Sequence, residues 1–306
     1  MPTPESSIPS TPAKKEGGVR GQGRPPCSRN AHDETVFVRC AQWRAALAPH
    51  REGVEAEHAS GARSERRFRH PTSVVRGRHS LHVKADEIRD YFDGWQENLA
   101  RVKSLMEVPE YYREAWLVLC CYVGAFGSLR YPGLRDNEKY KKAVREYSGM
   151  TDFYDQIDLF FFMQWPRSEF RDEDRYKRLK NYKEISNAIV AKYGEPDQIR
   201  VKVRYVPPNE FVACIEQAPF PGYDRQNLLD HIHLFSLCEM LYHYARCPAV
   251  HNVRFPFVTR ITRVDRSVRY EDNHAITGDR LLETAQNILS NLSKECIEKT
   301  RWPWEL

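Results

Sequence analysis

The stretch Arg246-Cys247-Pro248-Ala249-Val250-His251 lies between two long amphipathic runs and brings a guanidinium and an imidazole to one helix end. The first run begins at Gln226. We expect its helix to end at Arg246, because Pro248 disfavours helical backbone just before it and removes a hydrogen-bond donor. Arginine binds phosphate groups, and histidine transfers protons near neutral pH. The stretch therefore predicts a phosphate-handling site between two helices.

The second run, residues 278–299, has the clearest helical periodicity in the chain. Its apolar residues recur at spacings of three and four, which places them on one helix face; they are Leu281, Leu282, Ala285, Ile288, Leu289, Leu292 and Cys296. Similar spacing predicts helices over residues 88–106 and 109–126 and around residues 140–147. The aromatic run at residues 153–162 predicts a further helix whose rings fill the core, because aromatic side chains bury large areas.

Other segments between these helices have different patterns. Residues 199–206 alternate apolar and basic side chains, which predicts a half-buried strand that residues 211–215 can join as a hairpin. The pattern of residues 253–270 predicts a loop or ribbon. The pattern of residues 167–192 predicts a charged, solvated helix. The expected fold class is mainly α, a helical bundle with a small β hairpin or ribbon insertion and a disordered N-terminal tail.

The N-terminal tail differs in composition from the rest of the chain. Residues 1–83 contain 14 Lys and Arg against 8 Asp and Glu, are rich in Pro, Gly and Ser, and have few apolar clusters. Such a segment buries too little apolar surface to offset the entropy of ordering it. We therefore predict a disordered basic tail over residues 1–82, before a folded domain over residues 83–306. A tether to nucleic acid, no role at all and an overlong gene model all fit this composition.

Charge and cysteine usage limit the classes of function. The tail carries the excess positive charge of a chain whose formal net charge is +5, so the folded part has no general basic surface. The eight cysteines are scattered without a C-x-x-C pair, which predicts a reducing, cytoplasmic setting. The longest apolar stretch, residues 115–126, is too short to cross a bilayer. No glycine-rich phosphate loop or other cofactor motif occurs, so no cofactor is expected.

The motif Tyr244-Ala245-Arg246-Cys247-Pro248-Ala249-Val250-His251, between a long helix and a final one, resembles the HEPN superfamily (higher eukaryotes and prokaryotes nucleotide-binding domain). Its local form is similar to the ApeA-like and abortive-infection-like branches. The segment Trp116–Pro132, followed by Lys139-Tyr140-Lys141-Lys142-Ala143-Val144, is similar to their first helices. Two features depart from the family pattern: Cys247 replaces a polar residue after the arginine, and the strand-like segments are not part of the family core.

The resemblance implies a helical domain, often a homodimer, in which Arg246 and His251 form a metal-independent ribonuclease site. Many active members of the superfamily belong to defence or toxin–antitoxin systems, which implies RNA as substrate and an antitoxin as partner. In this hypothesis Arg246 holds the scissile phosphate and His251 acts as general acid or base. The residues predicted to contact RNA are Arg254, Arg260, Arg263, Arg266, Arg269 and His274.

Two alternatives remain open from the sequence. His243, Cys247 and His251 recur at helical spacing that suits zinc ligands, although a fourth ligand is not evident. A non-catalytic helical module is the other alternative, in which the same groove binds RNA, a nucleotide or a partner protein.

Overall fold

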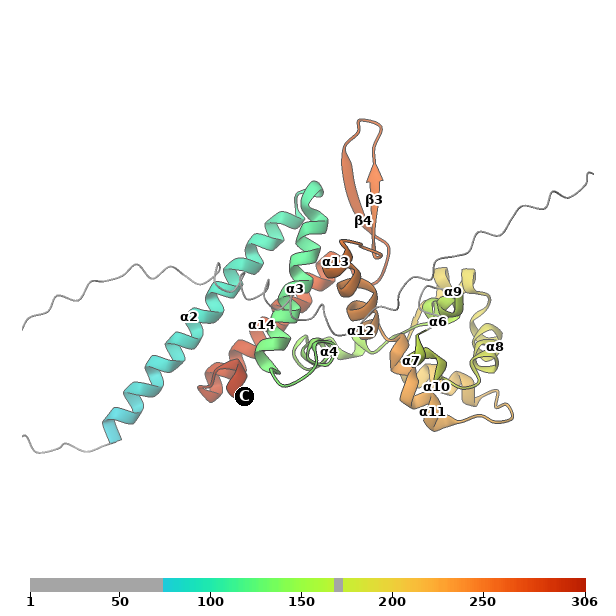
Figure 1. Cartoon of the computed structure of the whole chain (residues 1–306), viewed down its shortest axis with the longest axis horizontal. Coiled ribbons are helices and arrows are strands. Elements are labelled where there is room, and N and C mark those ends of the chain that lie inside the picture. Colours follow the sequence, from blue (N-terminus) through green and yellow to red (C-terminus); the bar gives the residue numbers. More distant parts are fainter. Residues whose placement is uncertain (1–73, 168–172) are drawn as a thin grey trace, which may run out of the picture. The chain divides into compact units, whose positions relative to one another are not determined.

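The computed structural model describes residues 74–167 and 173–306, with side chains described from Lys84 onward. The described chain is mainly α-helical and contains two short antiparallel strand pairs, which confirms the predicted fold class (Figure 1). Within the described residues the first helix begins at Val74, so the last nine residues of the predicted tail, 74–82, are helical; residues 1–73 of the tail lie outside the described residues.

Long helices pack against one another and form much of the core: α2 lies on α3 and α14, and α3 also packs on α4. Their bounds, with those of the short 3-10 turns beside them, are α2 Val74–Met106, η1 Pro109–Tyr111, α3 Tyr112–Arg130, α4 Asp136–Tyr147, α14 Gly278–Lys299 and η5 Pro303–Glu305. All seven apolar residues of the predicted stripe on α14 are buried. Burial of each large apolar side chain contributes roughly 1.5–3 kcal/mol, so this stripe fixes α14 in the bundle.

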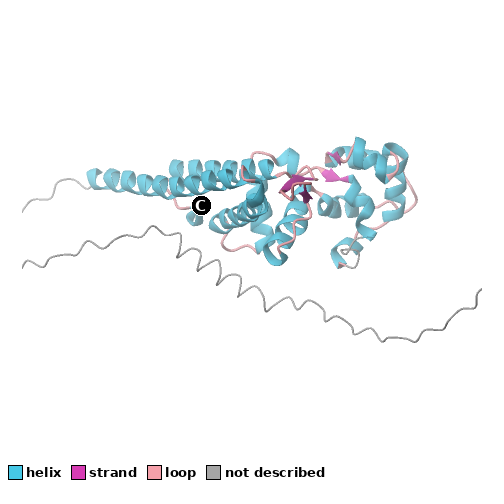
Figure 2. Ribbon diagram, turned by 90° about the horizontal axis from the view of Figure 1, so that it is seen from above, coloured by secondary structure: helices cyan, strands magenta, loops and turns pink. Residues whose placement is uncertain are grey.

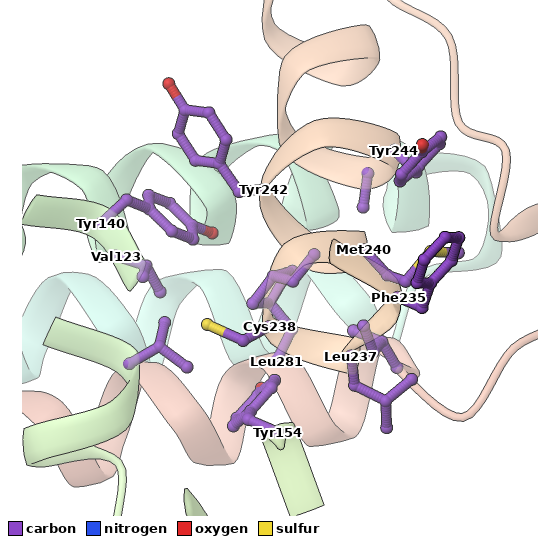
Figure 3. Close-up of a cluster of buried hydrophobic side chains, with 14 of the residues drawn as sticks. Val123, Tyr140, Tyr154, Phe235, Leu237, Cys238, Met240, Tyr242, Tyr244 and Leu281 are labelled. Carbon is purple, nitrogen blue, oxygen red and sulfur yellow. The ribbon is translucent and has the colours of Figure 1, made fainter. Parts of the chain in front are cut away.

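A series of short helical segments leads to Arg246 and His251. It consists of α11 Arg225–Ile232, η3 His233–Phe235, α12 Leu237–Met240, η4 Leu241–Arg246 and α13 Cys247–Asn252. Leu237 and Cys238 of α12 are completely buried, in the same cluster as Tyr140 of α4 and Leu281 of α14 (Figure 3). The core therefore fixes the segment that leads into Arg246.

The aromatic run at residues 153–162 is buried or half-buried as predicted, but it is not one helix. It divides into α5 (Thr151–Tyr154), β1 (Ile157–Asp158) and α6 (Leu159–Gln164). The division follows from Asp158, whose side chain accepts a hydrogen bond from the Phe161 amide at 2.9 Å and so starts a new helix. The 3-10 turn η2, Trp165–Arg167, follows α6.

The predicted hairpin at residues 199–215 is wrong. Residues Pro196–Lys202 form helix α9, residues Pro208–Glu216 form helix α10, and only Tyr205–Val206 form a strand, β2, which pairs with β1. Each helix has a proline in its first turn and an acidic residue near it, and both features favour helix initiation. These start signals prevail over the apolar–basic alternation, and Val201 is left 78% exposed.

The single charged helix predicted at residues 167–192 is also wrong. The described part contains α7 (Asp174–Lys177) and α8 (Tyr182–Tyr193), while residues 168–172 lie outside the described chain. Asn181 separates the two helices with a φ of 57°, a left-handed conformation that asparagine tolerates and that a helix does not contain.

The predicted ribbon is confirmed as an antiparallel hairpin of β3 (Val258–Thr262) and β4 (Val268–Asp272) (Figure 1). Figure 2 shows the described strands in magenta as short pieces among the cyan helices. In its register Arg260 lies opposite Tyr270, and Ile261 lies opposite Arg269. The ribbon leads directly from α13 toward α14 and stands out from the helices beside it (Figure 1).

Gly127 lets helices α3 and α4 approach closely, because a Cβ atom at this position would lie 2.7 Å from the backbone oxygen of Lys139. We expect Gly127→Ala to lower the free energy of unfolding by roughly 1–3 kcal/mol, since a backbone atom cannot move aside as a flexible side chain can. The control is Gly94→Ala in α2, where no atom lies within 4 Å of the added Cβ; it should stabilise by up to about 1 kcal/mol. Equal effects of the two variants in urea unfolding would contradict this packing account.

Candidate active site

The helical backbone continues past Arg246, so the predicted helix end at this residue is wrong. The segment η4 is a π-helix in which the Cys247 amide bonds to the carbonyl of Tyr242, five residues earlier, and α13 follows without a break. In a regular α-helix Pro248 would crowd the carbonyl four residues before it and leave that carbonyl without a donor. The wider π turn accommodates the proline, and α13 ends only at Val253, which is left-handed with a φ of 53°.

This local geometry brings the two predicted catalytic residues together. Arg246 ends the π-helix and His251 lies in the last turn of α13, so that Nη1 of Arg246 is 3.4 Å from Nε2 of His251. A guanidinium has donors only. A hydrogen bond in this contact therefore has Nε2 of His251 as its acceptor, with the ring proton assigned to Nδ1. The His251 side chain is exposed to solvent.

Arg246 is held from its other side by a carboxylate and a tyrosine. Nη2 of Arg246 lies 2.9 Å from Oδ2 of Asp136, at the start of α4, and the hydroxyl of Tyr242 donates to the same oxygen at 2.9 Å. The guanidinium also lies over the Tyr242 ring, 5.3 Å from its centroid. Only 12% of the Arg246 side chain is exposed. The charged group is thus fixed at the edge of the core with one face toward His251.

The charge state of this group follows from its neighbours. Burial by itself lowers the pKa of Arg246, but the Asp136 carboxylate raises it, and the net result is a pKa above the ordinary value. Burial raises the pKa of Tyr242, so its hydroxyl stays protonated and donates to Asp136. Arg246 is therefore a permanent cation beside an accessible imidazole, an arrangement that can bind a phosphate and transfer a proton.

The sequence analysis did not identify Asp136 or Tyr242 as part of this site. Tyr242 precedes Arg246 by four residues on a helical run, which is a usable signal for a shared face. Asp136 is 110 residues away from Arg246 in the sequence and reaches it only through the packing of α4 against η4. No local pattern indicates that contact.

The arginines predicted to contact RNA lie on or beside the β3–β4 ribbon. Arg260, Arg263 and Arg266 are exposed, and Arg254 is exposed at the start of the segment. Arg269 forms an ion pair with Glu271 on the same strand. The ribbon thus presents several arginines to solvent.

His274 does not belong to this surface, because it is buried. Its ring stacks on Phe257 with centroids 3.9 Å apart, and its Nε2 lies 3.2 Å from Oδ2 of the buried Asp158. Its Nδ1 accepts from the Ile276 amide at 3.2 Å, so the proton is on Nε2 and the ring is neutral. Arg204 supplies the opposite charge to Asp158 at 2.8 Å. His274 is thus a core residue that anchors the base of the ribbon, and it is unavailable to RNA in this conformation.

The zinc alternative has no support in the part of the chain that the structure describes. Within those residues no group of three or more His, Cys, Asp or Glu side chains is arranged to hold a metal ion. His243, Cys247 and His251 are therefore not gathered into a ligand set. His243 instead contacts Glu239, with 2.9 Å between Nε2 and Oε1.

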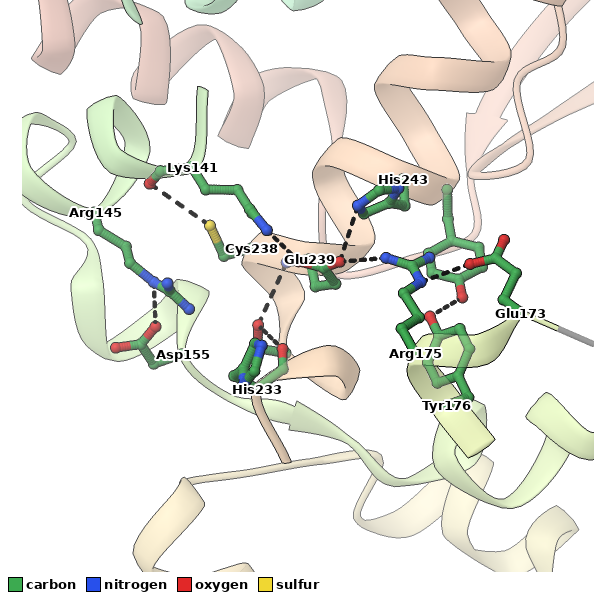
Figure 4. A network of polar contacts seen from close by, with 12 residues as sticks. Lys141, Arg145, Asp155, Glu173, Arg175, Tyr176, His233, Cys238, Glu239 and His243 are labelled. Carbon is green, nitrogen blue, oxygen red and sulfur yellow. Dashed lines mark hydrogen bonds and ion pairs between the residues drawn. The ribbon is translucent and has the colours of Figure 1, made fainter. Parts of the chain in front are cut away.

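Glu239 is the centre of a second polar cluster that the sequence analysis missed. This buried carboxylate contacts Lys141 of α4 at 2.8 Å, Arg175 of α7 at 2.5 Å and His243 of η4 (Figure 4). Burial by itself raises the pKa of Glu239, but His243 and Lys141 lower it to about 2. Glu173 in turn pairs with Arg175, so the charges are nearly balanced. The cluster joins α4, α7, α12 and η4 and has a structural role.

No protein-family model, curated protein or solved structure matches the chain. Among the described helices, none combines the length and apolar character that crossing a bilayer requires. The case for a function therefore depends on the residues themselves.

The buried His274 generates a prediction about pH. Burial lowers its pKa below the ordinary value of 6.5 despite the raising effect of Asp158. The unfolded chain then binds this proton more readily than the folded chain. The stability that the neutral ring contributes is thus present above about pH 6.5 and is lost as the pH falls toward the folded pKa.

We expect the free energy of unfolding to fall between pH 7 and pH 5. In His274→Gln, which keeps a neutral donor for Asp158, the fall should be smaller. Chemical denaturation at several pH values measures both slopes. Parallel curves for the two proteins would rule out His274 as the source.

Proposed function

We propose that this protein is a metal-independent endoribonuclease of the kind that the HEPN resemblance implies. The single observation that carries the proposal is the 3.4 Å approach of Arg246 Nη1 to His251 Nε2, with His251 exposed and Arg246 fixed by Asp136. A chance contact between a surface arginine and a surface histidine would not have a carboxylate that fixes the arginine. Holding a long side chain in one geometry costs entropy, and here the ion pair with Asp136 offsets that cost.

In the proposed reaction the 2′-hydroxyl of RNA attacks the adjacent phosphorus. The new bond joins O2′ to phosphorus, and the bond from phosphorus to O5′ breaks. The products are a 2′,3′-cyclic phosphate and a 5′-hydroxyl. Nε2 of His251 accepts the proton of the 2′-hydroxyl, and Arg246 stabilises the negative charge that develops on the phosphoryl oxygens. A phosphate oxygen would replace the imidazole as the acceptor of the Arg246 N–H group.

The leaving O5′ needs a proton from the side opposite to the attack. One imidazole cannot stand on both sides of the phosphorus, so we propose that a second copy of the chain supplies the other His251 across a two-fold axis. The proposal also includes a cytoplasmic defence or toxin–antitoxin setting, with an antitoxin as the protein partner. The exposed arginines Arg254, Arg260, Arg263, Arg266 and Arg269 are the proposed RNA contacts.

A second candidate function is a non-catalytic helical module that binds RNA, a nucleotide or a partner protein. The observation in its favour is that Arg246 is largely buried, with 12% of its side chain exposed, and forms an ion pair with Asp136. In this alternative Arg246 joins η4 to α4, and His251 has no chemical task.

The test is cleavage of a labelled RNA in the presence of excess chelator. We expect His251→Ala to lower the rate by about 10²–10⁴-fold and Arg246→Ala by about 10²–10³-fold. Asp136→Asn should lower it by roughly 10- to 100-fold, because it loosens the position of Arg246 while leaving the reacting groups in place.

The matched control is Arg200→Gln, which removes one exposed positive charge from α9 and should leave the rate unchanged. Thermal unfolding of each variant separates a loss of chemistry from a loss of fold. The binding-module alternative gains support if the wild-type protein binds RNA but does not cleave it. Cleavage by His251→Ala at the wild-type rate would refute the nuclease proposal.

A further inference from the structure

The tip of the β3–β4 ribbon, residues 263–267, is a tightly specified turn. The Arg266 amide donates to the carbonyl of Arg263 at 3.0 Å, and the Arg263 amide donates to the carbonyl of Ser267 at 2.9 Å. The Asp265 carboxylate accepts from both the amide and the hydroxyl of Ser267, at 2.9 and 2.6 Å. These hydrogen bonds fix the backbone of the tip, so the Cα and Cβ atoms of its residues have defined positions.

Arg266 occupies a position at which glycine is the natural choice. Its φ is 67°, in the left-handed region, and three-residue hairpin loops of this type usually place glycine there. A side chain with a Cβ is strained in this conformation, and nothing in the fold of the ribbon requires an arginine there. The arginine therefore has a cost in stability without a packing contact to explain it.

The arginines near the tip also lack partners of opposite charge. Arg260, Arg263 and Arg266 are exposed, and within the described residues none of them forms an ion pair. The one acidic residue at the tip, Asp265, is bonded to Ser267 instead. Other arginines near this site differ: Arg246 pairs with Asp136 and Arg269 with Glu271. The tip thus presents uncompensated guanidinium groups on a rigid turn.

Val264 lies between these arginines and is fully exposed, with a relative exposure of 105%. An exposed apolar side chain that is flanked in sequence by two exposed arginines suits an unpaired nucleic-acid strand, in which phosphates alternate with accessible faces of bases. A double-stranded RNA hides these faces by stacking. An acidic protein segment would satisfy the arginines but would offer no regular apolar partner for Val264.

We propose that the ribbon tip, through Arg263, Val264 and Arg266, binds an unpaired stretch of the RNA substrate away from the bond that is cut. The inference rests on the proposed function for the identity of the partner, and it adds which form of RNA is bound and where. The five-residue strands extend about 17 Å at ~3.3 Å per residue. We expect a dinucleotide at Arg246 and His251 to be too short to reach the tip, and a longer unpaired strand to reach it.

The experiment compares Arg266→Gly with the wild-type protein in three measurements. Because glycine relieves the left-handed backbone, the melting temperature should rise by about 1–3 °C. The dissociation constant for a long unstructured RNA, measured by fluorescence anisotropy, should rise about three- to tenfold, and its dependence on salt should weaken by about 0.7 in logarithmic slope, as for one lost phosphate contact. The third measurement is cleavage of the long RNA below saturation, whose rate should fall by the same factor as the affinity.

Two controls separate backbone from charge. Thr300→Gly relieves the same left-handed conformation at the end of α14, where φ is 51°, without removing a charge. It should raise the melting temperature and leave RNA binding unchanged. Arg200→Gln removes a positive charge elsewhere and should also leave binding unchanged.

The inference is overturned if Arg266→Gly binds the long RNA as well as the wild-type protein does. It is equally overturned if a perfect duplex RNA or a polyglutamate peptide shows the same dependence on Arg266 as the unpaired strand. Failure of the nuclease proposal looks different: binding of unpaired RNA would still depend on Arg266, but the long RNA would not be cut.

Discussion

The ion pair between Asp136 and Arg246 is the contact through which the candidate site depends on the rest of the fold. Asp136 opens helix α4, which is packed on α3, while Arg246 closes a π-helix that leads out of the buried turn α12. The 2.9 Å contact joins these two elements, and Tyr242 donates to the same carboxylate oxygen. A mobile surface arginine would neutralise a phosphate only at an entropic cost, whereas this guanidinium is already in place. The packing of the helices thereby fixes the position of the Arg246 guanidinium.

The backbone between Arg246 and His251 is as important as the ion pair. An α-helix that ended at Arg246, as Pro248 suggests, would place His251 in a loop of undefined direction. The π turn absorbs the proline, and the chain completes a further helical turn before it leaves through the left-handed Val253. π-Helical segments of this kind occur frequently at functional sites, because the extra residue redirects the side chains that follow. Val253 also begins the segment that leads into the β3–β4 ribbon and its arginines.

Long-range packing explains most of what the sequence could and could not predict. The α14 stripe was predicted to the residue, because a 3.6-residue period over 22 residues has no competing interpretation. The strand expected at residues 199–206 was wrong because short apolar runs are ambiguous, and here Pro196 and Pro208 started helices instead. His274 was predicted to contact RNA, yet the ring of Phe257 and the carboxylate of Asp158 enclose it in the core. The Arg246–His251 pair was found from its spacing, whereas Asp136 was not, since only the tertiary fold brings it near.

The chemistry of the RNA ends after cleavage tests the central claim most directly. If Arg246 and His251 act through the 2′-hydroxyl without a metal, RNA incubated with the protein and excess chelator carries 2′,3′-cyclic phosphate and 5′-hydroxyl ends. Mass spectrometry of the fragments distinguishes these ends from others. Fragments with 5′-phosphate ends, or cleavage that disappears when divalent metal is removed, would contradict the account.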